Sequence, residues 1–467
     1  MVGIGGAGMS ALARLYLQQD RRVSGSDESD SKALHDLAAL GAEVHVGHDA
    51  AYLGDADLVV YSSAVPESRP ELVEARRRGL RTLKHAQALG ELFNTRRGIA
   101  VAGTHGKTNT SGMISYILER CGRQPTFQVG GELVDLDTSA RWGAGEWMVV
   151  EADEFDRRFL EYRPEIAVVT NVEPDHFEYY STVEEMVGAF ADFLARVVPG
   201  GCVVACGQDD RLARLLDGIH QVKVVRYGIA ADGQTPPDGW DWWAEDVREG
   251  PGGSRFRACR LAGDGGVDAV DASLGLPGRH QVLNALAAMA ACALAGVPPA
   301  AAAAALATYH GTRRRFQLVG EAGGVRIYED YAHHPTEVRV NLAAARLLVS
   351  PPGRLWAVFQ PHLYQRTEHL FDEFSRAFDA ADRVLLTDVY SPSGREPVGT
   401  YRGSRELVAA IDRPGAAHVR DLAAARRVLG EAMRPGDVVL VMGAGPINIL
   451  AAQAAADLAE REAQHAG

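Results

Sequence analysis

Short apolar runs alternate with helix-like patterns along most of the chain. Residues 99–102, 147–150 and 166–169 are short and almost entirely apolar, as buried strands are. After residue 108, apolar side chains recur at helical spacing until Gly122. This alternation predicts parallel sheets covered by helices, and therefore an α/β fold. Similar runs predict further strands at residues 23–27, 43–46, 58–61, 202–204, 325–328, 355–359, 384–386 and 438–441.

The chain has 467 residues, more than one ordinary domain contains. A βαβ series closes near residue 95, a second series opens with the strand at 99–102, and a third begins near residue 312. We therefore expect a Rossmann-like N-terminal domain over residues 1–95, a central P-loop ATPase-type α/β domain over 96–311, and a Rossmann-like C-terminal α/β domain over 312–467.

Two segments have an unusual composition. Residues 229–275 are rich in Gly, Pro, Asp and Trp, with short alternating stretches. They predict a small antiparallel insert, because three tryptophans would be odd in a solvated linker. Residues 285–307 are apolar enough to suggest a membrane span, but Pro298 and Pro299 divide them. We expect two alanine-rich core helices and no membrane insertion.

The net charge and the cysteines of the chain limit the kinds of function and the cellular location that we expect. A net charge of −13 argues against a general nucleic-acid binder. The five cysteines do not have the spacing of a zinc site, which is typical of free thiols in a reducing cytosol. No secretory signal is visible, so we expect a cytoplasmic protein. We also expect a monomer or a dimer. The chain opens at Met1 with almost no strand before its first glycine loop, which leaves open whether Met1 is the natural start.

The segment from Gly103 to Thr108 predicts a nucleotide triphosphate site. It lies between a predicted strand and a predicted helix, where small residues let backbone N–H groups surround phosphate oxygens. Lys107 would neutralise the outer phosphates, and the Thr108 hydroxyl would face Mg²⁺. The match is to a variant of the P-loop, since position 101 is Val, and an ordinary glycine turn is the alternative.

Two polar groups follow the next predicted strands. Glu151 ends the strand at 147–150, and His176 comes shortly after the strand at 166–169. Because ligands of parallel sheets bind at the carboxyl ends of the strands, Thr108, Glu151 and His176 are expected to converge on one magnesium ion. The alternatives are a helix cap for Glu151 and a structural loop histidine for His176. With Glu154 and Asp156, this segment contains more carboxylates than one metal ion needs as ligands. We expect these two side chains to be solvated.

The N-terminal loop contains G-x-G-x-x-G at Gly3, Gly5 and Gly8, with Asp27 about twenty residues on. An NAD site is one interpretation. Because a complete ATP site follows, the diphosphate of a second substrate is the preferred one. In the third unit, His333 and His334 follow a predicted strand, and nucleotide contact is favoured over metal binding there, since neighbours in sequence rarely face one ion.

The chain resembles the Mur ligases over nearly its whole length. Eight strings occur in the order of that family: GIGGAGMSALA, YSSAVPESRPEL, GTHGKTNT, EADEFD, TNVEPDH, LPGRHQVLN, DYAHHPTEV and FQPHLYQRT. Residues 183–198 contain no lysine, which agrees with the branch that adds L-alanine. The resemblance implies ATP-dependent, Mg²⁺-requiring ligation of L-alanine to the lactyl carboxylate of UDP-N-acetylmuramate through an acyl phosphate, the first peptide step of peptidoglycan synthesis.

The resemblance also implies roles for individual residues. Lys107, Glu151 and His176 would be catalytic, and Thr108, Glu151 and His176 would hold the metal. ATP would be bound by Gly103, Thr104, His105, Gly106, Lys107, Thr108, Asn284, Arg315, Asp330 and His333. The UDP-sugar would be bound by Gly5, Gly6, Gly8, Met9, Ser10, Asp27, Ser62 and Ser63. The alanine pocket would be formed by Tyr331, His362 and Arg366. Leu363 stands where many relatives have Arg, so the alanine carboxylate would depend on Arg366.

Other functions stay open at this point. A related murein peptide ligase or another sister Mur ligase would share the ATP motifs. A nucleotide-gated sensor would be expected to lack Lys107, Glu151 or His176, and all three are present. An NAD-dependent oxidoreductase would use the N-terminal glycine loop instead.

Overall fold

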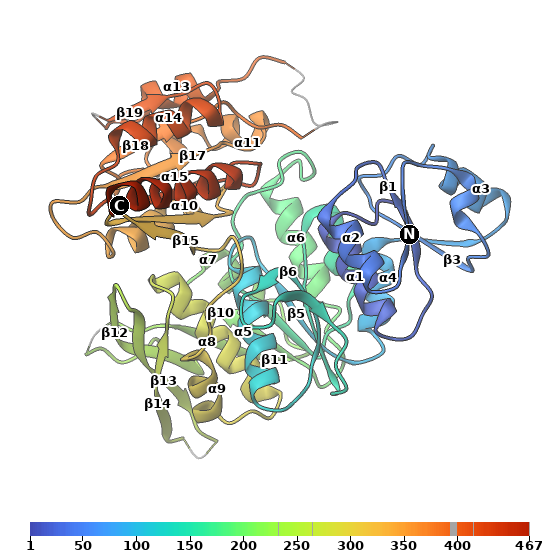
Figure 1. Ribbon diagram of the computed structural model, residues 1–467. Coiled ribbons are helices and arrows are strands. Elements are labelled where there is room, and N and C mark those ends of the chain that lie inside the picture. The colour runs from blue at the N-terminus through green and yellow to red at the C-terminus, as the bar shows by residue number, and fades with distance from the viewer. Residues whose placement is uncertain (232, 264, 393–398, 414, 467) are drawn as a thin grey trace.

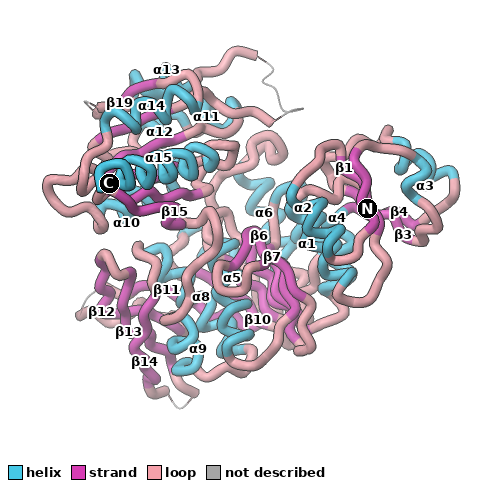
Figure 2. The backbone as a smooth tube through the Cα atoms, viewed as in Figure 1, coloured by secondary structure: helices cyan, strands magenta, loops and turns pink. Residues whose placement is uncertain are grey.

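The computed structural model describes residues 1–467 except 232, 264, 393–398, 414 and 467. Figure 1 shows three lobes that follow one another along the chain, coloured blue, green to yellow, and orange to red. Each lobe contains both helices and strands (Figure 2), which confirms the predicted three-domain α/β architecture.

The N-terminal lobe is a small parallel α/β unit. Strand β1 pairs with β2, β3 pairs with β4, and Val2 bridges the two pairs through Ser26 and Tyr61. The predicted strands at 23–27, 43–46 and 58–61 are present. The elements are α1 (Ala7–Leu17), β1 (Ser24–Asp27), α2 (Lys32–Ala39), β2 (Glu43–Val46), η1 (Ala50–Leu53), β3 (Leu58–Tyr61), α3 (Pro70–Arg77), β4 (Arg81–Lys84) and α4 (His85–Phe93).

The central lobe is built on one large sheet. Within the described residues it has ten strands in the order β14-β13-β12-β11-β10-β9-β5-β8-β6-β7, and β5 pairs in parallel with both β8 and β9. The strands are β5 (Arg97–Ala102), β6 (Thr126–Leu133), β7 (Thr138–Arg141), β8 (Trp147–Glu151), β9 (Ile166–Val169), β10 (Cys202–Cys206), β11 (Lys223–Ile229), β12 (Trp242–Gly250), β13 (Gly253–Leu261) and β14 (Val267–Leu274). The helices are α5 (Lys107–Arg120), η2 (Phe155–Glu161), α6 (Val183–Leu194), α7 (Asp210–Leu216), α8 (Arg279–Leu294) and α9 (Pro299–Leu306).

The antiparallel segment predicted after residue 229 is not a separate insert. Its strands β12, β13 and β14 are antiparallel to one another, but β12 pairs in parallel with β11 and so extends the central sheet. Trp240 fixes this edge, because its ring covers Gly207 and Gly228, where a Cβ would lie 2.4 Å and 2.1 Å from the ring atoms. The tryptophans are therefore core residues of the sheet edge.

The alanine-rich stretch forms the two expected core helices. Helix α8 packs with α5; after a short break, Pro298 caps α9 and Pro299 is its first residue. None of the described helices combines the length and the apolar character that a membrane span needs. The thiols of Cys202 and Cys206 are buried and unpaired on β10, as predicted.

The C-terminal lobe contains a sheet in the order β15-β16-β20-β17-β18-β19 over the described residues, parallel except for the β15–β16 hairpin. The strands are β15 (Gln317–Ala322), β16 (Val325–Asp330), β17 (Leu355–Phe359), β18 (Arg383–Leu386), β19 (Ala416–His418) and β20 (Val438–Met442). The helices are α10 (Pro335–Arg346), α11 (Tyr364–His369), α12 (Phe371–Ser375), α13 (Ser404–Ala410), α14 (Leu422–Ala432) and α15 (Asn448–Ala466). The loops that follow β16 and β17 contact the central lobe.

Candidate active site

The phosphate loop lies between β5 and α5, as predicted. Gly103 and Gly106 have φ of +129° and +81°, which favours glycine. There is also no room for a side chain at either position, because a Cβ would lie 2.1 Å from Thr170 Oγ1 at Gly103 and 2.5 Å from Asn284 Oδ1 at Gly106. The loop ends at the N-terminus of a 14-residue helix, where free N–H groups favour an anion.

Lys107 is held by a buried carboxylate. Its Nζ donates to both oxygens of Glu154, at 3.0 and 2.8 Å, and to the carbonyl oxygens of Gly103 and Thr104. Glu154 is 1% exposed, so the expectation of a solvated side chain was wrong. Burial opposes its ionisation, but the charges of Lys107 and His176 prevail and lower its pKa. Glu154 is thus an ionised part of the site that sequence reasoning missed.

The three predicted metal ligands have separate partners in this arrangement. Glu151 accepts a hydrogen bond from Gly130 N at 2.9 Å, and Thr108 Oγ1 accepts one from Arg315 at 3.1 Å. His176 Nε2 lies 3.5 Å from Glu154 Oε1. Among the described residues, the compact donor group here is Asp153, Glu154 and His176, whose ligand atoms lie within 4.8 Å of one another.

His176 is a cation in this environment. Burial disfavours its charged form, but Glu154, Glu178 and Asp175 outweigh burial and raise its pKa to about 10. Its backbone φ of +56° turns the side chain out of the loop after β9. The ring of Phe155, at 5.1 Å between centroids, covers it.

His105 of the phosphate loop reaches the C-terminal lobe. Its Nδ1 lies 3.2 Å from Glu337 Oε1, and its Nε2 lies 3.4 Å from Glu173 Oε2. Burial disfavours protonation, but the two carboxylates outweigh it and raise the pKa of His105 to about 9. The loop is therefore tied to helix α10, 232 residues further along the chain.

Two residues predicted to contact ATP lie at the end of β16: Asp330 is its buried last residue, and His333 is half-buried in the turn that follows. Asp330 accepts hydrogen bonds from Phe316 N and Ala332 N at 2.7 and 2.6 Å. Burial raises its pKa to about 6 although Arg315 opposes this. Burial likewise lowers the pKa of His333 to about 4. Asp330 therefore joins the segment before β15, which contains Arg315, to the turn after β16, which contains His333.

A small cavity lies at the junction of the central and C-terminal lobes. Its volume is about 150 Å³, and it includes the three residues predicted for the amino-acid pocket. It is lined by Asp153, Phe155, His176, Glu178, Tyr331, His333, His362, Leu363, Arg366 and Ala444. Leu363 supplies an apolar wall.

Arg366 is fixed across the lobe boundary. It is 4% exposed, and its Nε donates to Asp175 Oδ1 at 2.9 Å. Its NH2 contacts Asp175 Oδ2 at 3.3 Å, and its NH1 lies 3.4 Å from His362 Nδ1. The guanidinium therefore presents its NH1 end toward His362 at the cavity.

The N-terminal glycine loop is organised around Asp27. Gly5 N donates to Asp27 Oδ2 at 2.9 Å, and Gly6 and Gly8 are exposed at the start of α1. Met9 is 2% exposed, so its side chain belongs to the core rather than to the loop surface. Ser10 Oγ donates to Ala7 O within the first turn of α1.

Ser62 and Ser63 follow β3 and face the central lobe. Arg158 NH2 donates to Ser63 Oγ at 2.7 Å, while Arg158 NH1 lies 3.2 Å from Asp153. Ser62 Oγ accepts from Ala64 N in its own turn. His85, which the sequence did not single out, contacts Gly8 O at 3.0 Å and adds a polar group beneath the glycine loop.

Asn284, predicted to meet adenine, lies on the second turn of α8 beside Gly106. Its Nδ2 donates to Gln281 Oε1 at 3.2 Å, and the same oxygen accepts from Asn109 on α5. These amides fix α8 against the end of the phosphate loop.

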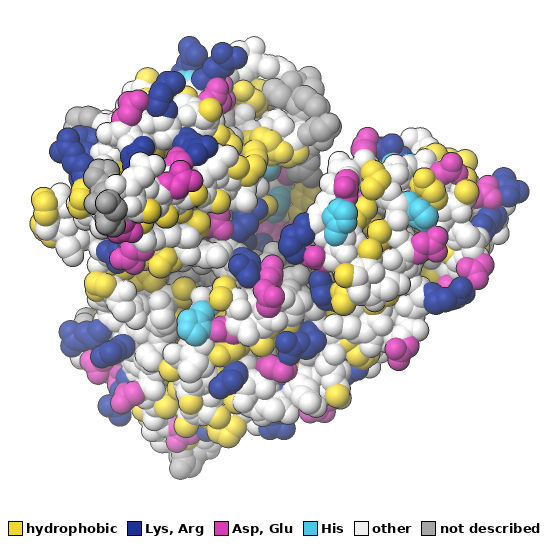
Figure 3. All heavy atoms as spheres, viewed as in Figure 1, with side chains coloured by type: hydrophobic (Ala, Val, Ile, Leu, Met, Phe, Trp, Pro, Cys, Tyr) yellow, Lys and Arg dark blue, Asp and Glu magenta, His cyan; other side chains and the backbone are white. Residues whose placement is uncertain are grey.

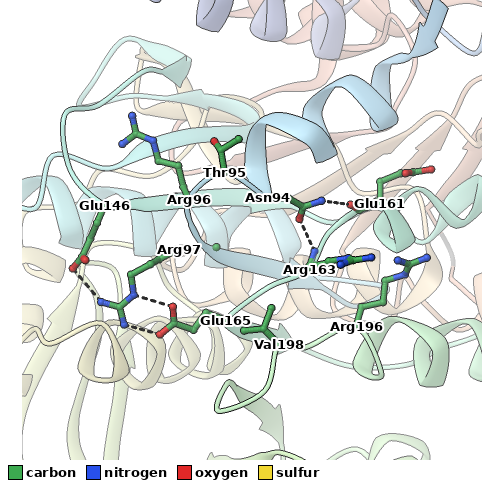
Figure 4. A pocket seen from close by; sticks show the side chains of 11 residues that line it. Asn94, Thr95, Arg96, Arg97, Glu146, Glu161, Arg163, Glu165, Arg196 and Val198 are labelled. Carbon is green, nitrogen blue, oxygen red and sulfur yellow. Dashed lines mark hydrogen bonds and ion pairs between the residues drawn. The ribbon is translucent and has the colours of Figure 1, made fainter.

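The recess between the lobes has charged walls. Figure 3 shows Lys or Arg and His side chains facing into it between the C-terminal and N-terminal lobes. A second cavity of about 780 Å³ lies at the amino ends of β5, β8 and β9, away from the phosphate loop. There Arg97 forms ion pairs with Glu146 and Glu165 (Figure 4). Because this cavity lies at the opposite ends of the strands from the phosphate loop, it is not part of the proposed nucleotide site.

Comparison with known proteins covers the whole chain. The Mur ligase family, catalytic domain, matches residues 1–97; the Mur ligase middle domain matches 101–292; and the Mur ligase, glutamate ligase domain matches 314–445. A UDP-N-acetylmuramate--L-alanine ligase of Mycobacterium marinum is 42% identical over 472 residues, covering 99% of this chain and 94% of the relative.

Solved structures agree with this match. The crystal structure of UDP-N-acetylmuramate-alanine ligase from Thermotoga maritima has a TM-score of 0.79 and 26% identity, and covers 100% of this chain and 99% of its own. A murein peptide ligase from Psychrobacter arcticus has a TM-score of 0.71 and 25% identity, with 98% of each chain covered. This chain belongs to the Mur ligase family.

Proposed function

We propose that the chain ligates L-alanine to the lactyl carboxylate of UDP-N-acetylmuramate, with ATP as the source of free energy. The names of relatives at 42% identity over nearly the full length support this activity. The single structural observation that carries it is that Glu154 joins Lys107 of the phosphate loop to His176, which lines the small cavity that also contains Arg366.

The proposal divides the work among three domains. Residues 1–95 would bind the UDP-sugar through Gly5, Gly6, Gly8, Ser10, Asp27, Ser62 and Ser63, with Met9 supporting the loop from the core. Residues 96–311 would bind ATP through Gly103 to Thr108 and Asn284. Residues 312–467 would add Arg315, Asp330 and His333 to the ATP site, and Tyr331, His362 and Arg366 to the amino-acid pocket. A cytoplasmic location, where ATP and small amino acids are available, is part of the proposal.

Phosphoryl transfer requires positioning and charge neutralisation. Lys107 and the N-terminus of α5 would receive the outer phosphates, and Arg315, which contacts Thr108, would approach them from the C-terminal domain. The incoming phosphates would compete with Glu154 for the ammonium of Lys107, since both are anions. The lactyl carboxylate attacks the γ-phosphorus, ADP leaves, and an acyl phosphate results.

A magnesium ion fits the donor set. Thr108, Glu151 and His176 would hold it, with Asp153 and Glu154 nearby as further oxygen donors. When bound, Mg²⁺ neutralises phosphate charge. His176 would have to lose the proton that Glu154 and Glu178 now stabilise in order to bind a metal.

The amino-acid pocket would select a small substrate. Its volume of about 150 Å³ equals about five water molecules at roughly 30 Å³ each, which suits alanine. The NH1 end of Arg366 would bind the alanine carboxylate, and Leu363 would face the methyl group. The amine then attacks the acyl phosphate carbon, and inorganic phosphate leaves the tetrahedral intermediate.

The test is phosphate release by the purified chain with ATP, Mg²⁺ and UDP-N-acetylmuramate, scanned over single L-amino acids. We expect the strongest response with L-alanine. Release that requires UDP-muramoyl-alanine or a murein tripeptide in place of these substrates would assign the chain to a sister ligase.

A further inference from the structure

A second cluster of ligand-type side chains lies apart from the proposed magnesium group. It consists of His105 on the phosphate loop, Glu173 in the loop after β9, and His334 at the start of α10. One nitrogen of each imidazole and one carboxylate oxygen lie within 4.8 Å of one another. Two of these residues belong to the central lobe and the third to the C-terminal lobe.

The distances match a tetrahedral metal site. His105 Nε2 and His334 Nδ1 lie 3.4 and 3.9 Å from the same oxygen, Glu173 Oε2. Nitrogen and oxygen ligands at about 2.0–2.2 Å from zinc are separated by about 3.3–3.6 Å in a tetrahedron. The distance from Glu173 to His105 falls within this range, and the distance to His334 is slightly longer.

The remaining ring nitrogens have the partners that metal-bound histidines need. His105 Nδ1 faces Glu337 Oε1 at 3.2 Å, and His334 Nε2 faces Pro174 O at 3.3 Å. These two acceptors would keep a proton on the nitrogens that they face, and an ion beside Glu173 would replace the proton that His105 Nε2 carries toward this carboxylate in the metal-free chain. His334 Nδ1 also accepts a long hydrogen bond of 3.3 Å from Thr336 N, which a metal ion would replace.

His105 Nε2 carries the strongest signal. It is buried, and within the described part of the chain it makes no hydrogen bond of acceptable geometry. A buried ring nitrogen of this kind requires either a proton or a cation. Glu173 is 31% exposed at its side chain, which gives an ion a path from solvent.

We propose that His105, Glu173 and His334 bind a transition-metal ion of the Zn²⁺ class and thereby join the phosphate loop to the C-terminal domain. Two imidazoles and one carboxylate favour zinc over magnesium, which prefers oxygen ligands.

The test is a Zn²⁺ titration of the full, metal-free chain by calorimetry, together with its thermal midpoint with and without Zn²⁺. Two substitutions remove one ligand each. His334→Asn keeps a side chain that can cap α10, and Glu173→Gln keeps an acceptor for Thr336 Oγ1. The matched control is His176→Asn, which alters the other His-carboxylate group and not this one.

We expect His334→Asn and Glu173→Gln each to weaken the tightest Zn²⁺ binding at least tenfold and to abolish the rise in thermal midpoint that Zn²⁺ gives the wild type. His176→Asn should leave both unchanged. Glu173→Gln gives the answer alone if His334→Asn does not fold. Wild-type Zn²⁺ binding by Glu173→Gln, or loss of the tight event only in His176→Asn, would overturn the proposal.

Discussion

Lys107 and Glu154 form a buried ion pair at the base of the phosphate loop. The carboxylate of Glu154 also faces His176. Because Glu154 is 1% exposed, water does not stabilise its negative charge. Removing one partner of such a pair leaves an uncompensated charge. The lysine that the sequence assigns to catalysis therefore also stabilises the fold.

We predict that Lys107→Met lowers turnover by at least about 100-fold, because the phosphates lose their cation. The same change should lower the free energy of unfolding by up to about 3–5 kcal/mol. The double variant Lys107→Met/Glu154→Gln should regain most of this stability without regaining activity. Denaturant unfolding and phosphate release measure the two effects. Unchanged stability of the single variant would contradict the structural role of the pair.

His85 provides a pH prediction. Burial, and secondarily the charge of Arg158, lower its pKa to about 4. Above the unfolded value of about 6.5 both states are neutral. Between pH 6.5 and 4, His85 binds a proton in the unfolded state but stays neutral in the folded state. The free energy of unfolding therefore falls as the pH falls. Below pH 4 both states are protonated.

We therefore expect the stability difference between wild type and His85→Gln to shrink as the pH is lowered from 6.5 to 4, measured by urea unfolding at each pH. Gln87→Ala, at a residue of the same helix α4 that does not titrate, is the control and should give a flat difference. If the stability difference for His85→Gln were also independent of pH, His85 would not contribute to the pH dependence of stability.

At the scale of elements, the strands and the loops that follow them could be predicted from sequence. The apolar runs correctly predicted strands β5, β8 and β9. The polar residues just after these strands led to the prediction of Lys107, Glu151 and His176 as site residues. The pattern predicted the hairpins β12–β14 but not their attachment to β11, because pairing between strands is a tertiary property. The burial of Glu154 and the contact of His105 with Glu337 depend on segments far apart in sequence.

The loop between β9 and α6 contacts helix α11, which carries Arg366 of the proposed amino-acid pocket. Asp175 in this loop orients Arg366, and Phe177 stacks on His369 at 4.6 Å between ring centroids. Burial opposes ionisation of Asp175, but Arg366 and neighbouring histidines strongly lower its pKa. The carboxylate is therefore charged when it orients the guanidinium.

We predict that Asp175→Asn raises the KM for L-alanine at least tenfold, with a smaller effect on the KM for UDP-N-acetylmuramate, because the guanidinium loses its charged partner. Steady-state kinetics with each substrate varied in turn measures the difference. Asp192→Asn on α6 breaks an exposed ion pair and should change neither value. Equal effects of Asp175→Asn on both substrates would contradict the assignment of Arg366.

At the scale of the whole molecule, Arg158 connects the N-terminal domain to the central one. It contacts Ser63 and Asp153, while its neighbour Arg157 contacts Glu185 and Asp192 on α6. We predict that Arg158→Ala raises the KM for UDP-N-acetylmuramate severalfold and leaves the KM for L-alanine nearly unchanged. Arg157→Ala is the matched control. The same kinetic change in both variants would indicate a general loss of charge instead.

The contact between Thr108 and Arg315 spans 207 residues. A ribosome therefore exposes the phosphate loop long before it makes the arginine that completes it. The contact between Arg315 and Thr108 can therefore form only after the first residues of the third domain have left the ribosome, so the phosphate loop gains this contact late in synthesis.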